Sequence, residues 1–134
     1  MSFLGKTYRA GSEENVEAFV KVLGLPAEMT AKLVQYKPDQ KFEKDGDAYK
    51  HTVITANKVK EIRFKSGETY DDKLRDLIPV KITYTVDGDT ITQVIKDDEG
   101  RSGTFKMEFS GDTMKATVTA SFWDGTAVRH YSAI

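Results

Sequence analysis

The spacing of apolar residues changes from helical to extended after Lys37-Pro38, and this change constrains the fold more than any other feature of the sequence. From there to the end of the chain, apolar and polar residues alternate, as in strands that bury one face. Short segments rich in Gly, Asp, Asn and Ser interrupt the alternation and predict consecutive antiparallel hairpins. These turn segments are Asp45-Gly46-Asp47, Ala56-Asn57, Ser66-Gly67, Asp87-Gly88-Asp89, Asp98-Glu99-Gly100, Ser110-Gly111-Asp112 and Asp124-Gly125.

The N-terminal part of the chain combines a short strand with two amphipathic helices. Residues 6–11 predict the strand, and Ser12 is expected to cap the first helix. Gly24-Leu25-Pro26 ends that helix and starts the second. The pair has the shape of a helix-turn-helix, but Lys21 and Lys32 are its basic residues, which argues against DNA binding. The apolar faces consist of Val16, Phe19, Val20 and Leu23 in the first helix and of Met29, Leu33 and Tyr36 in the second.

The first strand and the hairpins together make about ten strands, which is enough to close a barrel. So many short strands closing up-and-down would enclose more space than their own side chains fill. A chain of 134 residues is long enough to bury one sizeable core. We therefore expect an all-β fold in a single domain spanning residues 1–134, a ten-stranded antiparallel up-and-down barrel capped by a helix-turn-helix lid.

Composition excludes several classes of protein. Lys and Arg number 20 and Asp and Glu 21, so the basic stripe of a nucleic-acid-binding protein is not expected. The chain has no cysteine, which rules out disulfide and thiolate chemistry. The segment Met1–Lys6 lacks the apolar stretch of a signal peptide, and no apolar run approaches the length of a membrane span. These features are typical of a soluble cytoplasmic protein.

Residues that could support catalysis are scattered. His51 and His130 lie far apart and in no metal-binding spacing, and we expect structural or solvent-facing roles for both. The acidic pairs Asp71-Asp72 and Asp97-Asp98 lie at predicted turns or strand ends, where solvated charge is the ordinary explanation. Nucleophile elbows, phosphate loops and dinucleotide fingerprints are missing from the sequence. We expect no enzyme activity, no cofactor and no metal.

A cation and a phenol share one face of the last predicted strand. Because strand residues alternate in direction, Arg129 and Tyr131 project together and His130 points away. If this face is interior, the arginine has no acid beside it in sequence, and an unpaired buried cation is costly. A ligand carboxylate would supply a partner through two parallel hydrogen bonds. The motif thus predicts an anionic ligand with an apolar tail; a solvated surface arginine is the alternative.

Gln93 is a polar residue on a predicted apolar face that it shares with Ile91 and Ile95. One interpretation is a structural amide whose hydrogen bonds are satisfied within the protein. The other is a hydrogen bond to a ligand or to trapped water in a polar part of the cavity.

The order of elements resembles the intracellular lipid-binding proteins, the family of fatty-acid-binding and cellular retinoid-binding proteins. Trp123-Asp124-Gly125, with one extra residue before Asn15, is most similar to insect midgut fatty-acid-binding members. The other segments that carry the resemblance are Phe3-Leu4-Gly5-Lys6, residues 15–24, Lys37-Pro38, residues 43–47, residues 61–72, residues 80–88 and Arg129-His130-Tyr131.

The resemblance implies a calycin-like barrel that holds a fatty acid in an internal, partly water-filled cavity. It assigns the carboxylate to Arg129 and Tyr131. Many members carry a second arginine where this chain has Met107, and the neighbouring Lys106 could replace it only if the strand register shifts. Gln93 matches a position that often lines the cavity with a polar group. The expected apolar wall or lid consists of Phe19, Met29, Leu33, Ile62, Phe64, Ile82, Tyr84, Phe105, Met107 and Val118.

The leading hypothesis is therefore a cytoplasmic monomer that binds long-chain fatty acids non-covalently and transports them. Entry is expected through the helix pair and the turns near Asn57 and Asp76-Leu77, with transient membrane contact through the helical lid. Two alternatives remain at this point. The same barrel could bind a retinoid or another anionic hydrophobic ligand, or it could bind no small molecule and act through its surface.

Overall fold

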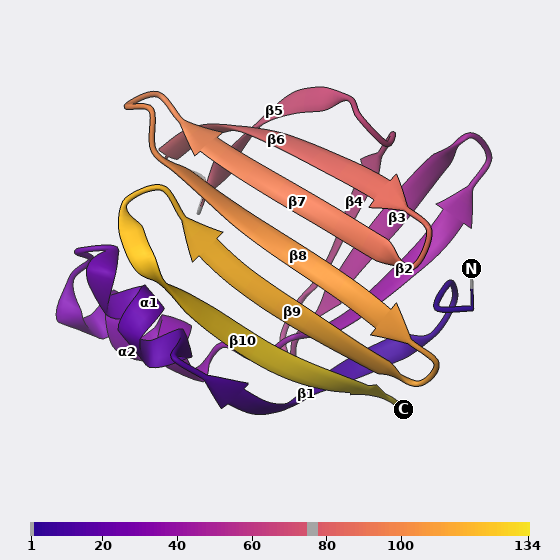
Figure 1. Cartoon of the computed structure of the whole chain (residues 1–134), viewed down its shortest axis with the longest axis horizontal. Helices are drawn as coiled ribbons and strands as arrows, with labels where there is room; N and C mark the ends of the chain where they lie inside the picture. The colour runs from indigo at the N-terminus through magenta and orange to yellow at the C-terminus, as the bar shows by residue number, and fades with distance from the viewer. Residues whose placement is uncertain (1, 75–77) are drawn as a thin grey trace.

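A single curled sheet, with two short helices across one of its ends, makes up the molecule (Figure 1). The structure is a computed structural model that describes residues 2–74 and 78–134. The helices are α1 (Val16–Val22) and α2 (Ala27–Gln35). The strands are β1 (Thr7–Glu14), β2 (Asp39–Asp45), β3 (Ala48–Ile54), β4 (Val59–Phe64), β5 (Thr69–Leu74), β6 (Ile78–Asp87), β7 (Thr90–Asp97), β8 (Ser102–Ser110), β9 (Thr113–Ala120) and β10 (Trp123–Ala133).

Strand order confirms the predicted ten-stranded antiparallel fold with its two-helix lid. The order is β4-β3-β2-β1-β10-β9-β8-β7-β6-β5, so β1 joins the start of the hairpin series to its end. Strands β4 and β5 are the two edges, and no ladder joins them among the described residues. Side chains cross this opening instead, because Phe64 of β4 stacks on Tyr84 of β6 with ring centroids 4.0 Å apart.

The first helix begins later than the sequence predicts. Strand β1 continues past Ser12 to Glu14, since Glu13 pairs with Arg129 and Glu14 with Val128 of β10. A register shift between Ala10 and Glu13 marks a bulge within this pairing. Asn15, in the left-handed conformation with φ 60°, then turns the chain into α1. Pairing with β10 therefore outweighs the capping tendency of Ser12.

Aromatic rings close the end of the barrel that lies opposite the helices, and we call this region the aromatic end. Phe3 stacks on Phe109 with ring centroids 4.0 Å apart. Tyr8 and Phe42 meet Phe109 edge-on, at 5.4 Å and 5.7 Å. Phe3, Tyr8 and Phe42 are fully buried. The N-terminal segment from residue 2 onward and the C-terminal end of β10 lie at the same end (Figure 1).

The other end, which we call the helical end, is less densely packed. Helix α1 packs on β10, where the Phe19 ring lies 5.5 Å from the Trp123 ring. Val20 is the buried residue of α1, whereas α2 buries no side chain completely. Met29 and Leu33, which form its apolar face, are half-buried. In the described part of the chain, neither helix is long and apolar enough to cross a membrane.

Candidate functional site

The inner face of the barrel carries most of the predicted apolar wall. Strand pairing aligns Ile82, Phe105 and Val118 with inward-facing neighbours, as the alternation predicts. Ile62, Gln93 and Phe105 retain partial exposure although they lie on this inner face. Among the residues predicted to line the wall or lid, Phe64, Ile82, Tyr84, Met107 and Val118 are buried, and Phe19, Met29, Leu33, Ile62 and Phe105 are half-buried.

Arg129 faces the interior near the helical end, with 13% of its side chain exposed. It lies in a row with Glu13 on β1, Ala116 on β9 and Met107 on β8. Its Nε is 3.6 Å from Glu13 Oε1, and its Nη1 donates a hydrogen bond of 3.1 Å to the Tyr36 carbonyl. The expectation that Arg129 lacks an acidic partner is thus wrong. The partner comes from a segment more than a hundred residues away, brought alongside by the pairing of β1 with β10.

A second cation lies in the same cluster, because Lys37 Nζ is 3.1 Å from Glu13 Oε1. Two cations sharing one carboxylate leave one net positive charge. Arg129 Nε and Glu13 Oε1 are both buried, and neither forms a hydrogen bond within the described residues. The guanidinium therefore keeps an unused donor beside the barrel interior, which suits a further anionic acceptor.

Tyr131 lies two residues further along the same face of β10 and is buried. Its hydroxyl accepts a 2.8 Å hydrogen bond from Gln40 Nε2 of β2. Sequence analysis missed Gln40, which is flanked by Asp39 and Lys41 at the start of a strand and has no local pattern that marks it. The structure therefore brings together Arg129, Tyr131 and Gln40 from two strands that are distant in sequence.

Gln40 also begins a row of hydrogen bonds across the barrel. Its Oε1 lies 2.8 Å from His51 Nε2, and His51 Nδ1 lies 2.9 Å from the Tyr84 hydroxyl. Gln93 Nε2 donates to that hydroxyl at 3.1 Å. We call the five residues Gln93, Tyr84, His51, Gln40 and Tyr131 the polar chain. Gln93 thus uses one amide hydrogen within the protein, as the structural interpretation of this residue expects.

His51 occupies the centre of the polar chain and has a structural role rather than a solvent-facing one. It is buried, stacks on Phe42 with ring centroids 4.3 Å apart, and takes part in two hydrogen bonds. Burial, and then the charge of Lys60, lower its pKa to about 3, so the imidazole is neutral at physiological pH. Burial likewise raises the pKa of Tyr84 and raises that of Tyr70, beside it, to about 12. The polar chain is therefore uncharged.

Position 107, where the resemblance implies a second cation in many family members, carries an uncharged Met107 in this chain. This side chain is buried on the inner face, and Lys106 is exposed on the outer one. The strand register is the predicted one, so Lys106 does not reach the interior.

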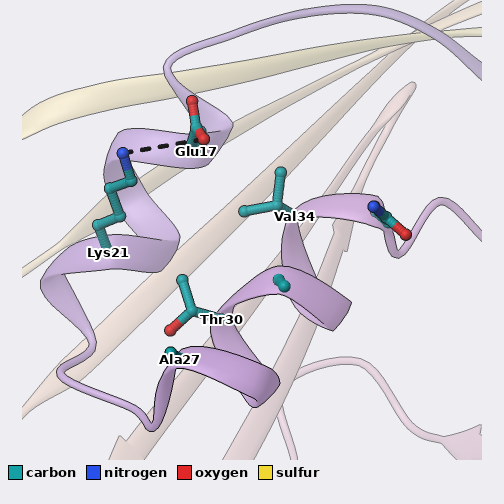
Figure 2. Close-up of a pocket in the computed structure, with 7 residues that line it drawn as sticks. Glu17, Lys21, Ala27, Thr30 and Val34 are labelled. Atoms are coloured by element: carbon teal, nitrogen blue, oxygen red, sulfur yellow. Dashed lines mark ion pairs between the residues drawn. The ribbon is translucent and has the colours of Figure 1, made fainter.

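Two surface pockets lie apart from Arg129 and Gln40. One, of about 390 Å³, lies between α1 and α2 and is lined mostly by small or exposed side chains (Figure 2). The ion pair between Glu17 and Lys21, 3.8 Å apart, lies at its edge. The other, of about 490 Å³, lies at the far ends of β8, β9 and β10, and Tyr131 is one of the residues that line it. No group of metal-ligating side chains occurs among residues 2–74 and 78–134. Of the predicted portal turns, Asn57 is exposed, and Asp76-Leu77 lies outside the described residues.

Comparisons with known proteins find relatives of one kind, although no protein-family model matches the sequence. Fatty acid-binding protein 1 of Manduca sexta is 46% identical over 133 residues, which cover 99% of this chain and 100% of that protein. Fatty acid-binding protein 2 of the same species is 43% identical over the same shares of both chains.

Solved structures agree with these relatives. The fatty-acid-binding protein isolated from Manduca sexta superposes with a TM-score of 0.89 at 43% identity, covering 98% of this chain and 100% of that one. The fatty acid binding protein of Schistosoma mansoni, in complex with arachidonic acid, gives a TM-score of 0.86 at 30% identity, covering 99% and 96%.

Proposed function

The chain belongs to the fatty-acid-binding protein family, and we propose that it binds long-chain fatty acids reversibly inside its barrel and transports them. The observation that supports this most directly is the inward-facing pair of Arg129 and Tyr131, with an unused guanidinium donor beside a hydroxyl held by Gln40. Arg129 binds the carboxylate, and Tyr131 donates a hydrogen bond to it. The wall residues identified above contact the tail.

The apolar tail supplies most of the binding free energy. Burying a methylene contributes about 0.8 kcal/mol at most. Even part of that sum for a long chain exceeds the roughly 8 kcal/mol that a micromolar affinity requires. Association costs several kcal/mol, which keeps the affinity below the naive total. The polar head therefore determines orientation and head-group selectivity more than total affinity.

Arg129 has to exchange partners when the carboxylate arrives. Its interactions with Glu13 and with the Tyr36 carbonyl, just after α2, are ones that a ligand carboxylate can replace. Binding at Arg129 is therefore coupled to the attachment of α2, and the helix pair with the turn at Asn57 forms the portal. The chain works as a cytoplasmic monomer without catalytic activity, and its lid contacts membranes transiently during transfer.

The test is a binding series with oleate, the fatty alcohol of equal length and retinoic acid, measured by displacement of a fluorescent probe. Arg129→Gln is expected to weaken oleate binding by about 1.5–3 kcal/mol, as for a charged hydrogen bond, and to spare the alcohol. Lys106→Gln removes an equal charge from the outer face and is the matched control, with no expected change. Equal losses for oleate and alcohol would place the head group elsewhere, and preferential binding of retinoic acid would favour the retinoid alternative.

Glu13→Gln tests whether Glu13 competes with the ligand carboxylate for Arg129. With the competing carboxylate removed, oleate is expected to bind tighter by about 0.5–1 kcal/mol. The exposed neighbour Glu14 gives the control Glu14→Gln, which should leave affinity unchanged. Weaker oleate binding by Glu13→Gln would mean that Glu13 orients Arg129 rather than competing for it.

A further inference from the structure

The hydrogen bonds of the polar chain all run in one direction, because each residue donates to the next one along. Gln40 Nε2 donates to Tyr131, which leaves Gln40 Oε1, an acceptor, facing His51 Nε2. His51 Nε2 must therefore carry the imidazole proton. In a neutral ring the other nitrogen is then an acceptor. His51 Nδ1 accordingly accepts the hydrogen of the Tyr84 hydroxyl, which in turn accepts from Gln93 Nε2.

All four bonds thus point from Gln93 toward Tyr131. The Tyr131 oxygen accepts from Gln40, so its own hydrogen is not used within the polar chain. If both glutamine amides were turned over, every bond would reverse and the Tyr131 hydrogen would be donated to Gln40. In that arrangement Tyr131 could offer a ligand only its oxygen, which a carboxylate cannot use.

We propose that His51 is a positioning residue for head-group recognition: through Gln40 it holds the Tyr131 hydroxyl as a donor aimed at an acceptor in the ligand. This deepens the proposed function and rests on it. The polar chain then selects ligands whose head group accepts hydrogen bonds, and an ionised carboxylate is the strongest acceptor of this kind. Selectivity comes in this way from a neutral histidine in addition to Arg129.

The location of the polar chain explains how it can hold one direction. Its members lie on β7, β6, β3, β2 and β10, so it crosses the barrel from one wall to the other. His51 is fixed between Phe42, which stacks on its ring, and Tyr84, which meets the ring edge-on at 5.8 Å. Such packing keeps the imidazole from rotating. Burial favours the neutral ring, since a low pKa removes the doubly protonated form in which both nitrogens donate.

The first test is ¹⁵N NMR of the imidazole of His51 in ligand-free wild-type protein at neutral pH. The expected result is a protonated Nε2 and an unprotonated Nδ1. A protonated Nδ1 with a bare Nε2, or an imidazolium, would overturn the proposal. Since no ligand is present, this result is independent of whether the protein binds fatty acid.

The second test is a double-mutant cycle with oleate, using His51→Phe, Tyr131→Phe and the double variant. Phenylalanine keeps a flat ring at position 51 but leaves Gln40 free to turn over. Each single change is expected to weaken binding by about fivefold, the effect of one hydrogen bond. The double variant should bind as Tyr131→Phe does, because His51 acts through that hydroxyl. Losses that multiply would show a general structural role and would contradict the proposal.

A third variant covers the case in which His51→Phe does not fold. His51→Gln keeps a donor toward Gln40 and is expected to bind oleate within about twofold of wild type, as a conservative rescue. A loss as large as that of Tyr131→Phe would contradict the proposal. If wild-type protein fails to bind oleate at all, the proposed function fails, while the tautomer measurement still decides the direction of the polar chain.

Discussion

The two ends of the barrel are built from different interactions. At the aromatic end, Phe3, Tyr8 and Phe42 surround Phe109 and are fully buried. At the helical end, α2 buries no side chain completely. There the chain following α2 is tied to the barrel by the Arg129 hydrogen bond to the Tyr36 carbonyl and by the ion pair of Lys37 with Glu13.

Because of this difference, we expect one end to determine the stability of the fold and the other to determine the access of ligand to the interior. Burial of rings at the aromatic end contributes free energy that no ligand can replace. The polar contacts at the helical end have partners that a ligand carboxylate can substitute. We therefore expect the aromatic end to carry much of the unfolding free energy and the helical end to open locally without global unfolding.

The largest expected effect compares one phenylalanine from each end. Phe109→Ala removes a ring that contacts three others and should lower the free energy of unfolding by about 3–5 kcal/mol. Phe19→Ala removes a half-buried ring from α1 and should lower it by about 1 kcal/mol. Urea unfolding of both variants measures the difference. Equal losses would contradict the division between the two ends.

The polar chain lies between the ends and gives the next largest effect. The pKa of His51 is lowered to about 3 in the fold, against an ordinary value of 6.5 in the unfolded chain. Below pH 6.5 the unfolded state therefore binds a proton that the folded state does not. The free energy of unfolding falls as pH drops through this window and levels off near pH 3.

Between pH 7 and about pH 4.5, His51 alone should lower stability by about 2–3 kcal/mol. Urea unfolding at both pH values, for wild type and His51→Gln, isolates this contribution as the part that the variant lacks. His130→Gln, which removes an exposed histidine from β10, is measured alongside as the control substitution. A variant His51→Gln with unchanged pH dependence would mean that the buried ring accepts a proton in the fold.

The smallest expected effect concerns the attachment of α1. A Cβ atom at Gly125 would lie within 3.0 Å of three atoms of the Trp123 ring, which packs against Phe19. Gly125→Ala should therefore displace this ring, with a stability loss of about 1 kcal/mol and faster exchange of fatty acid.

Trp123 is the single tryptophan of the chain, so its fluorescence reports the displacement directly. Gly103→Ala is the control, because its Cβ would meet the Thr119 carbonyl at an ordinary 3.9 Å. Unaltered emission from Gly125→Ala would show that the position of the Trp123 ring does not depend on the absence of a side chain at residue 125.

Local patterns predicted the strands and their faces, because a period of two residues follows from backbone geometry alone. Alternation placed Tyr131 and Met107 on the inner face correctly. Interactions between distant segments were not predictable in the same way. Glu13 reaches Arg129 only through a bulge in β1, whereas Gln40 reaches Tyr131 and His51 reaches Tyr84 only once the sheet curls. Their roles depend on the curled sheet as a whole, which no short segment encodes.

The opening between β4 and β5 also bears on self-association. A free strand edge can template a further strand from another molecule, which is a common origin of aggregation. Both edges here carry exposed charges that oppose such pairing, since an incoming strand would have to desolvate them. These charged residues are Lys60, Glu61 and Arg63 on β4 and Asp71 and Lys73 on β5. The place where the barrel is least complete is thereby protected against polymerisation.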